Sequence, residues 1–295
     1  MPGGGTVRAI RTRIRSVQNS AKVTKAMELV ASSKTRRAQA RALAARPYAG
    51  QMRAVLAQLS GSASVGADEL HPLLQTRPVK HFAFIHITAD RGLAGGLNAN
   101  MNRAGASLAL EHQPNVEQVS VVTVGRKGRD FFRRSGFPRL AEFSGLGDYP
   151  GFEAVTPIAR LVIDDYTSGA IDQVFIGFQQ FVNTAVQRPT LRQLLPVAPP
   201  EGVERDSVDF LFEPSPEVLL QTLLPRYVEM QIFEALLEAS ASEQSARMVA
   251  MRAATDAAND MVNDLTLTYN KARQEMITSE LLDIVGGKAA LENAG

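Results

Sequence analysis

The stretch ITADRGLAGGLN, residues 87–98, has the composition of a ligand-binding turn, because it is rich in Gly and lies between an apolar run of strand length and a helix-like stretch. Its glycines do not have the G-x-G-x-x-G spacing of a dinucleotide site, and the chain contains no G-x-x-x-x-G-K-S/T sequence. A tight turn, or a contact surface for another chain, is therefore favoured over nucleotide binding, and no cofactor is expected. The candidate residues of this turn are Asp90, Arg91, Gly92, Gly95 and Gly96.

The other residues with catalytic or ligating chemistry do not form a recognisable set. Asp90 and Arg91 at a strand end could act in an α/β enzyme, but no Ser/His/Asp arrangement can be argued from spacing. The four His residues lack metal-ligand spacing and Cys is absent, so no metal site is expected. The basic turn GRKGRD, residues 125–130, could hold a phosphate, although a solvated helix start is favoured. The sequence thus predicts a protein with no catalytic and no metal-binding residues.

Residues 6–59 are predicted to form one helix. Apolar or small side chains recur at alternating intervals of three and four from Val7 onward, which is the spacing of a coiled-coil seam. Pro47 and Gly50 predict a kink or a local break. At ~1.5 Å per residue the helix would be ~80 Å long, so it cannot be packed inside a single domain.

Residues 214–286 are predicted to form a second, longer helix. The same heptad spacing continues along it and passes through Met261 and Met276. Gly286 and Gly287 are typical helix stop signals and are expected to end it.

The middle of the chain has the pattern of an α/β domain. Runs rich in β-branched and aromatic residues alternate with helix-like stretches, which predicts a largely parallel, Rossmann-like sheet. Apolar stretches on both sides of Asn183 predict an antiparallel pair that closes the sheet. The predicted boundaries are an N-terminal helix at 1–60, a connector at 61–78, the α/β domain at 79–212, a C-terminal helix at 213–287 and a tail at 288–295.

Both connectors enter the same domain, so the two helices are expected to form an antiparallel coiled coil. Ile10, Ile14 and Val17 should then face the stretch 254–265. The second helix exceeds the first by about 20 residues, and that excess is expected to protrude as a single helix of ~30 Å.

Charge is distributed unevenly along the chain. Residues 1–60 contain twelve Lys or Arg and one acidic residue, whereas residues 216–295 contain six Lys or Arg and twelve Asp or Glu. The segment KTRRAQAR, residues 34–41, could follow a nucleic-acid backbone, but it lacks interleaved aromatic residues and keeps the heptad seam. We therefore expect no nucleic acid and predict that Lys34, Arg36 and Arg37 face acidic groups of a protein partner. No apolar run approaches the ~20 residues of a membrane span, so no direct membrane insertion is expected.

Three segments, in order along the chain, resemble the gamma subunits of F-type ATP synthases. Their first helix is similar to residues 14–52, IRSVQNSAKVTKAMELVASSKTRRAQARALAARPYAGQM. Their central Gly-rich motif is similar to ITADRGLAGGLN, with Ala94 where Cys is common. Their C-terminal signature is similar to residues 241–287, ASEQSARMVAMRAATDAANDMVNDLTLTYNKARQEMITSELLDIVGG.

The resemblance implies a rotor shaft, the central stalk of a proton-driven rotary ATP synthase. Such a shaft transmits torque from a membrane c-ring to a ring of three alpha and three beta subunits and drives the catalytic sites of that ring through their states in turn. It also contacts a small epsilon subunit and is not itself catalytic. No signal or organellar transit peptide is evident, so we expect a bacterial protein on the cytoplasmic side of the inner or plasma membrane, held there peripherally.

Residue by residue, the resemblance implies that the shaft contacts the beta subunit through Met27, Arg247, Gln274, Thr278 and Glu280. It implies no role for the Gly-rich segment beyond a turn or an interface. A structural adaptor, whose coiled coil has no part in rotation, is the alternative. A shaft is one copy among six ring subunits, whereas an adaptor would form homodimers through its own seam.

Overall fold

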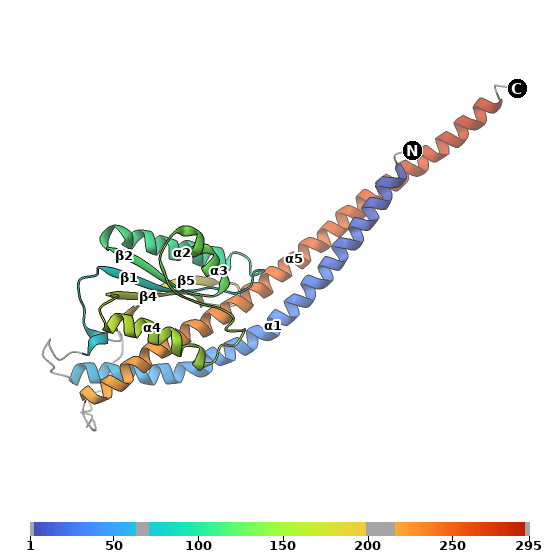
Figure 1. Ribbon diagram of the computed structural model, residues 1–295. Helices are drawn as coiled ribbons and strands as arrows, with labels where there is room; N and C mark the ends of the chain where they lie inside the picture. Colours follow the sequence, from blue (N-terminus) through green and yellow to red (C-terminus); the bar gives the residue numbers. More distant parts are fainter. Residues whose placement is uncertain (1–2, 63–70, 199–215, 293–295) are drawn as a thin grey trace. The chain divides into compact units, whose positions relative to one another are not determined.

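The computed structural model describes residues 3–62, 71–198 and 216–292 (Figure 1). The chain divides into two compact units. The sheet unit consists of residues 31–247, and the helix-pair unit consists of residues 1–30 together with residues 248–295. Each of the two long helices contributes to both units.

The sheet unit is built on a five-stranded sheet with strand order β3-β2-β1-β4-β5. Its strands are β1 (His81–Ile87), β2 (Gln118–Val124), β3 (Arg139–Phe143), β4 (Gln173–Phe181) and β5 (Gln187–Leu195). The first four run parallel, and β5 pairs antiparallel with β4. The prediction of a mostly parallel sheet closed by an antiparallel pair is confirmed. Strand β3 was not predicted, because it is short and its side chains are mostly exposed.

Three helices follow the parallel strands in the order that the sequence predicts. They are α2 (Leu97–His112), α3 (Arg126–Ser135) and α4 (Thr156–Thr167). Short 3-10 turns lie at Pro72–Leu74 (η2), Gln113–Asn115 (η3) and Phe152–Ala154 (η4). Helices α2 and α3 cover one face of the sheet, and α4 covers the other (Figure 1).

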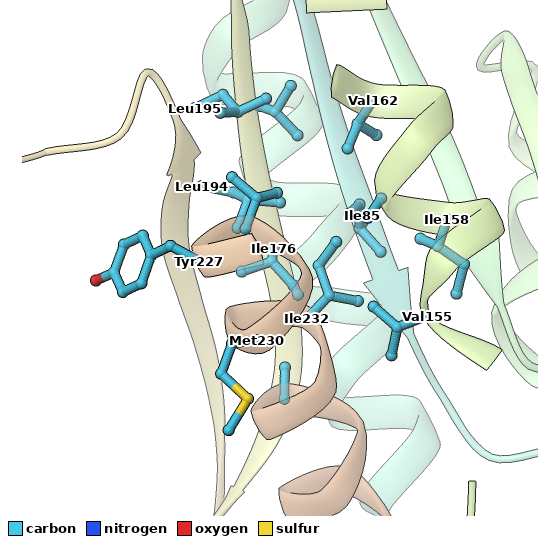
Figure 2. Close-up of a cluster of buried hydrophobic side chains, with 14 of the residues drawn as sticks. Ile85, Val155, Ile158, Val162, Ile176, Leu194, Leu195, Tyr227, Met230 and Ile232 are labelled. Carbon is cyan, nitrogen blue, oxygen red and sulfur yellow. The ribbon is translucent and has the colours of Figure 1, made fainter. Parts of the chain in front are cut away.

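The larger core lies on the α4 face, where the two long helices also pack. Figure 2 shows Ile232 among Ile85 and Ile176 of the sheet and Val155 at the start of α4, all of them fully buried. Burial of each such side chain stabilises the fold by ~1.5–3 kcal/mol. This apolar contact anchors the long helices to the sheet.

The other face is an aromatic core that surrounds a buried histidine. His86 is completely buried against Phe132, and its Nε2 lies 2.9 Å from Oδ1 of Asn102. Burial lowers the pKa of His86 to about 4, although the hydrogen bond that the imidazole donates to Asn102 opposes the shift. Gly105 of α2 and Gly128 of α3 approach the imidazole so closely that a Cβ on either would lie 2.7 Å from a ring atom.

The long helices are α1 (Gly3–Ser62) and α5 (Pro216–Glu292). Both predicted helices are confirmed, but a local break at Pro47 and an end of the second helix at Gly286 are wrong. Helix α1 continues through Pro47 and Gly50 without a break. Helix α5 continues past Gly286, where the backbone lacks the positive φ of a Gly stop signal, so the predicted tail at 288–295 is helical as far as Glu292.

Candidate functional site

Helices α1 and α5 pair in the helix-pair unit through a polar layer. Thr24 and Thr255 share a hydrogen bond of 2.8 Å between their hydroxyl oxygens. The carboxylate of Glu28, only 5% exposed, accepts from Arg252 at 3.1 Å and from Lys25 at 3.0 Å. The hydrogen bond from Lys25 is the main cause that holds the pKa of Glu28 below its usual value, although desolvation opposes it. The partner of the later residue on α1, Glu28, comes earlier on α5 than the partner of Thr24, so the two helices run antiparallel at this contact.

Burial along this unit follows heptad spacing on both helices. On α1 the less exposed positions are Val7, Ile10, Ile14, Val17, Ala21, Thr24, Met27 and Glu28. On α5 they include Met251, Thr255, Ala258, Val262, Leu265, Tyr269, Ala272 and Met276. Met261, predicted in the seam, is 45% exposed, and its neighbour Val262 takes the inward position. Most of these side chains are small or half-exposed.

The hydrogen-bonded pairs also define the register. The offset is the pairing of Thr24 with Thr255, and along antiparallel helices each residue back on α1 corresponds to one residue forward on α5. It places Ile14 near Leu265 and Ile10 near Tyr269. Ile14 does line one surface pocket with Tyr269. The predicted facing stretch, 254–265, therefore ends about one turn too early.

The offset separates the residues predicted to contact the beta subunit. Half-buried Met27 lies opposite about residue 252, whereas Gln274, Thr278 and Glu280 are exposed ~30–40 Å further along α5. These four residues of the helix-pair unit therefore do not form one cluster.

The C-terminal part of α5 has exposed apolar side chains. The same offset places Gly3, the first helical residue of α1, opposite about Met276. Every residue from Ile277 to Gly286 is exposed. The large apolar side chains among them, each more than half exposed, are Leu281, Leu282, Ile284 and Val285.

In the sheet unit, the Gly-rich segment forms a tight turn between β1 and α2, as predicted. Asn98 closes it, because its Oδ1 accepts from the Ala89 amide at 3.1 Å. Of the three glycines of the turn, only Gly95 has a positive φ, and Gly96 is the N-cap of α2. Arg91 is exposed and forms no ion pair within the described residues.

Asp90 is the structural centre of this edge of the sheet. Its Oδ1 accepts from the backbone amide of Arg126 at 2.9 Å, at the first residue of α3. Its Oδ2 accepts from the backbone amide of Gly145 at 2.8 Å. The carboxylate therefore joins the ends of two neighbouring parallel strands and holds the loop that follows β3.

A cavity of about 270 Å³ lies at this edge, under α5. Its wall includes Asp90, Arg126, Gln179 and Glu243. Burial raises the pKa of Glu243, although its hydrogen bond with Arg247 opposes the shift. The carboxylates already have intrachain partners, and the described residues contain no group of three His, Asp or Glu placed to hold a metal ion.

Arg247, predicted as a contact with the beta subunit, is largely engaged within the chain. Its side chain is 11% exposed, and its guanidinium lies 2.5 Å from the carboxylate of Glu243. It also donates to the backbone carbonyl of Gly92 at 3.3 Å, so α5 is tied to the Gly-rich turn. The structure thus brings Arg247 together with two predicted turn residues, Gly92 and Asp90, at one edge of the sheet.

Asp148 was missed by sequence reasoning. Its Oδ2 lies 2.6 Å from Nζ of Lys34 on α1, and its Oδ1 accepts from Gln244 of α5 at 3.3 Å. The backbone carbonyl of Asp148 accepts from Ser240 of α5 at 2.6 Å. Lys34 is therefore occupied within the chain, contrary to the expectation that it faces a partner, while Arg36 and Arg37 are exposed. Only the run of Gly around Asp148, SGLGDYPG, hinted at an ordered loop here.

Within the described residues, no helix has a stretch that is long and apolar enough to cross a membrane.

Comparisons with known proteins agree over nearly the whole chain. The family model described as ATP synthase matches residues 6–291. An ATP synthase gamma chain of Dehalococcoides mccartyi is 54% identical over 285 residues, which is 97% of this chain and 99% of the relative. One from Roseiflexus castenholzii is 50% identical over 287 residues, which is 97% of this chain and 98% of the relative.

Solved structures of ATP synthases share the fold. A chain in the central stalk and c-ring structure of the Tetrahymena thermophila mitochondrial enzyme is 27% identical, with a TM-score of 0.59 over 79% of this chain and 99% of that one. A chain in the rotor structure of the Euglena gracilis mitochondrial enzyme has a TM-score of 0.68 over 93% of this chain and 100% of that one, and at 19% identity this likeness concerns the fold alone. From the match over residues 6–291 and the identity of 54% to a gamma chain, this chain belongs to the family of ATP synthase gamma chains, a non-catalytic subunit of that complex.

Proposed function

We propose that this chain is the rotor shaft of a proton-driven rotary ATP synthase. Torque enters the sheet unit from a membrane c-ring and passes along the long helices, which form an antiparallel two-helix coiled coil. The turning shaft drives the catalytic sites of the alpha and beta subunits through their states in sequence.

One observation carries this proposal. Residues 277–286 of α5 lie beyond the N-terminal end of α1, yet they include apolar side chains that are more than half exposed, such as Leu282 at 66% and Ile284 at 69%. A single exposed helix of this kind does not bury its apolar surface within its own chain. A surrounding ring of subunits supplies the apolar environment that these side chains lack.

The composition of the seam supports a role as a shaft. A shaft must stay rigid while its outer surface slides past different partners. The seam between α1 and α5 is fixed in register by the Thr24–Thr255 and Glu28–Arg252 pairs, which a shift of one turn would break. Along the paired parts of the helices, residues 6–30 and 248–276, the exposed side chains are mostly polar or small, so no single rotary angle is held there by large apolar burial.

The partners proposed for the shaft are the alpha and beta subunits along the helix-pair unit, and the epsilon subunit and c-ring at the sheet unit. Met27, Gln274, Thr278 and Glu280 are proposed contacts with the beta subunit. Arg247 remains a proposed contact, although its intrachain bonds leave it only 11% exposed. The resulting location is peripheral, on the cytoplasmic side of a bacterial inner or plasma membrane, with no nucleic acid bound.

The experiment uses the absence of Cys from the chain. Thr278→Cys is labelled with a maleimide-benzophenone probe in the complete membrane-bound complex and illuminated. Cross-linking of this chain to an alpha or beta subunit should stop steady-state ATP hydrolysis and ATP-driven proton pumping together. The control is the same variant capped with N-ethylmaleimide and illuminated.

Full hydrolysis by the cross-linked complexes would overturn the rotor role. The composition of the purified complex provides a second test. One copy of this chain per six ring subunits is expected, whereas a homodimer without ring subunits would favour a structural adaptor.

A further inference from the structure

We propose that the loop of residues 144–148 is a clasp through which the sheet unit grips both long helices, with Asp148 as the positioning residue that makes torque transfer stiff. This inference rests on the proposed rotor function. It also gives the Gly-rich turn a role, because Asp90 of that turn holds the clasp in place.

A single residue of the loop, Asp148, contacts both long helices. Its carboxylate receives Lys34 of α1 at 2.6 Å and Gln244 of α5 at 3.3 Å, and its backbone carbonyl receives Ser240 of α5 at 2.6 Å. The side chains of Lys34 and Asp148 are both 30% exposed, and the hydrogen bond from Lys34 is the main cause that lowers the pKa of Asp148. The loop therefore touches two helix segments that are more than 200 residues apart in sequence.

The next loop residue strengthens the connection to α1. Arg41 donates to the backbone carbonyl of Tyr149 at 3.2 Å, and its guanidinium lies 4.9 Å from the centre of the Tyr149 ring. Lys34 and Arg41 are two turns apart on α1, so the loop holds this helix at two points along its length.

The clasp is fastened to the sheet through Asp90. Gly145, which has a φ of 77°, donates its amide to Asp90 at 2.8 Å, while the other oxygen of the same carboxylate holds the first amide of α3. Charge-assisted hydrogen bonds of this kind are about twice as strong as neutral ones. A second link, from Arg247 to the Gly92 carbonyl at 3.3 Å, ties α5 directly to the same turn.

The hydrogen bonds of the clasp are directional, whereas the contacts of the apolar core are not. Apolar burial holds the helices against the sheet, but it is non-directional and resists sliding or rotation of a helix only weakly. Hydrogen bonds lose strength steeply when their angles change, so they resist the tangential displacement that torque produces. Helix α1 is continuous from Lys34 back to its first residue, and α5 is continuous from Gln244 to its last. A contact that holds Lys34 and Gln244 therefore acts on the whole of each helix.

The first experiment measures coupling in membrane vesicles that contain the complete complex. Asp148→Ala is compared with Asp164→Ala, which removes the same charge from an exposed position on α4. Since the clasp is one of several contacts, we expect roughly a two- to threefold fall in protons pumped per ATP hydrolysed for Asp148→Ala and no change for Asp164→Ala. Lys34→Met should produce part of this fall, and the double variant should be no worse than Asp148→Ala alone.

The second experiment separates a mechanical role from a purely structural one. In Lys34→Cys/Asp148→Cys, the two new thiols are the only ones in the chain, and a short bismaleimide can link them. Pumping per ATP should be low before linking and return toward the wild-type value after it. A wild-type ratio in Asp148→Ala, or no recovery on linking, would overturn the clasp.

The two proposals can fail independently. If cross-linking at Thr278→Cys leaves hydrolysis intact, the rotor role fails whatever Asp148 does. If that cross-link stops hydrolysis while Asp148→Ala remains fully coupled, only the clasp fails.

Discussion

The same two helices pack in two different ways along their length. In the sheet unit, α1 and α5 bury large apolar side chains such as Leu56, Leu224 and Ile232, each no more than 2% exposed. In the helix-pair unit the buried seam positions are small or polar, such as Ala21 at 8% exposed, with Met251 as the one large apolar side chain among the described residues. One end of each helix is therefore part of a globular core, and the other end belongs to a thin two-helix layer.

The difference in packing suggests that the sheet unit provides most of the stability and that the helix-pair unit is the part suited to motion against partners. A large apolar contact holds a helix against the sheet, and the directional bonds of the clasp add the resistance to sliding that the proposed entry of torque at this end requires. Small seam residues bury little area, so the helix pair depends on its polar register pairs and, in the proposed complex, on contacts with the ring of subunits. Substitutions should consequently have large effects on unfolding in the sheet unit and small ones in the helix-pair unit.

The largest effect is expected in the core of the sheet unit. Ile232→Ala removes three methyl or methylene carbons from a fully buried site between the sheet and α4, so the free energy of unfolding should fall by ~2–5 kcal/mol. Chemical denaturation of the full-length chain measures it. Val249→Ala, at a 42% exposed position on the same helix, is the control and should cost far less. Equal losses would show that α5 is not anchored through this core.

A pH effect of similar size is expected from His86. Its pKa is about 4 when folded and near 6.5 when unfolded, so the unfolded chain binds the proton more readily. Stability from the neutral imidazole is fully present above pH 6.5 and falls as the pH drops toward 4, by about 3 kcal/mol in total. Denaturation curves between pH 7 and pH 4 measure this slope.

His86→Leu should flatten that slope, because no proton is taken up at this position on unfolding. Protonation of Asp148, whose pKa is lowered in the folded chain, removes stability only at lower pH and does not overlap the upper part of the window. An unchanged slope in His86→Leu would contradict the assignment.

A smaller loss is expected where two helices approach His86. Gly128→Ala would place a Cβ 2.7 Å from Cδ2 of the imidazole and 2.9 Å from the Thr88 hydroxyl, and such overpacking costs ~1–3 kcal/mol. Gly50→Ala is the matched control, because a Cβ there meets nothing within 4 Å and Ala favours a helix over Gly by up to ~1 kcal/mol. The two variants should therefore shift the melting temperature in opposite directions.

The sequence predicts this molecule well where the signal is local. Heptad spacing is sufficient to find both long helices, β-branched and aromatic runs are sufficient to find β1, β2 and β4, and the apolar stretches on both sides of Asn183 indicate that β5 follows β4. Strand β3 escapes because an exposed edge strand lacks an apolar run. Gly286 misleads because a glycine ends a helix only when its backbone turns into the left-handed region, which it does not do here.

The candidate site is less predictable because its contacts are long-range. Lys34 and Asp148 are 114 residues apart, and nothing in either neighbourhood indicates the other. The heptad pattern around Arg247 does not indicate its hydrogen bond to the Gly92 carbonyl, which depends on how the fold places α5 beside the Gly-rich turn. The Gly-rich turn was recognisable as a turn, but its connection to the loop after β3 required the sheet order.

The smallest effects are expected in the helix-pair unit, where two variants with the same new charge can be compared. Ile14→Asp introduces a carboxylate into the half-buried seam near Leu265, so it should weaken the local pairing by about 1–2 kcal/mol. Thr278→Asp adds the same charge to an exposed position beyond the N-terminal end of α1, and it should leave the pairing unchanged. Because the sheet unit dominates global unfolding, the readout is limited proteolysis of the full-length chain, followed at cleavage sites within 1–30. Faster cleavage in Ile14→Asp alone is expected, whereas equal acceleration in both variants would contradict the register.

In the complete complex Thr278→Asp should have the larger effect on function, because it places a charge where α5 is proposed to contact the beta subunit. It should lower ATP-driven proton pumping without any loss of stability.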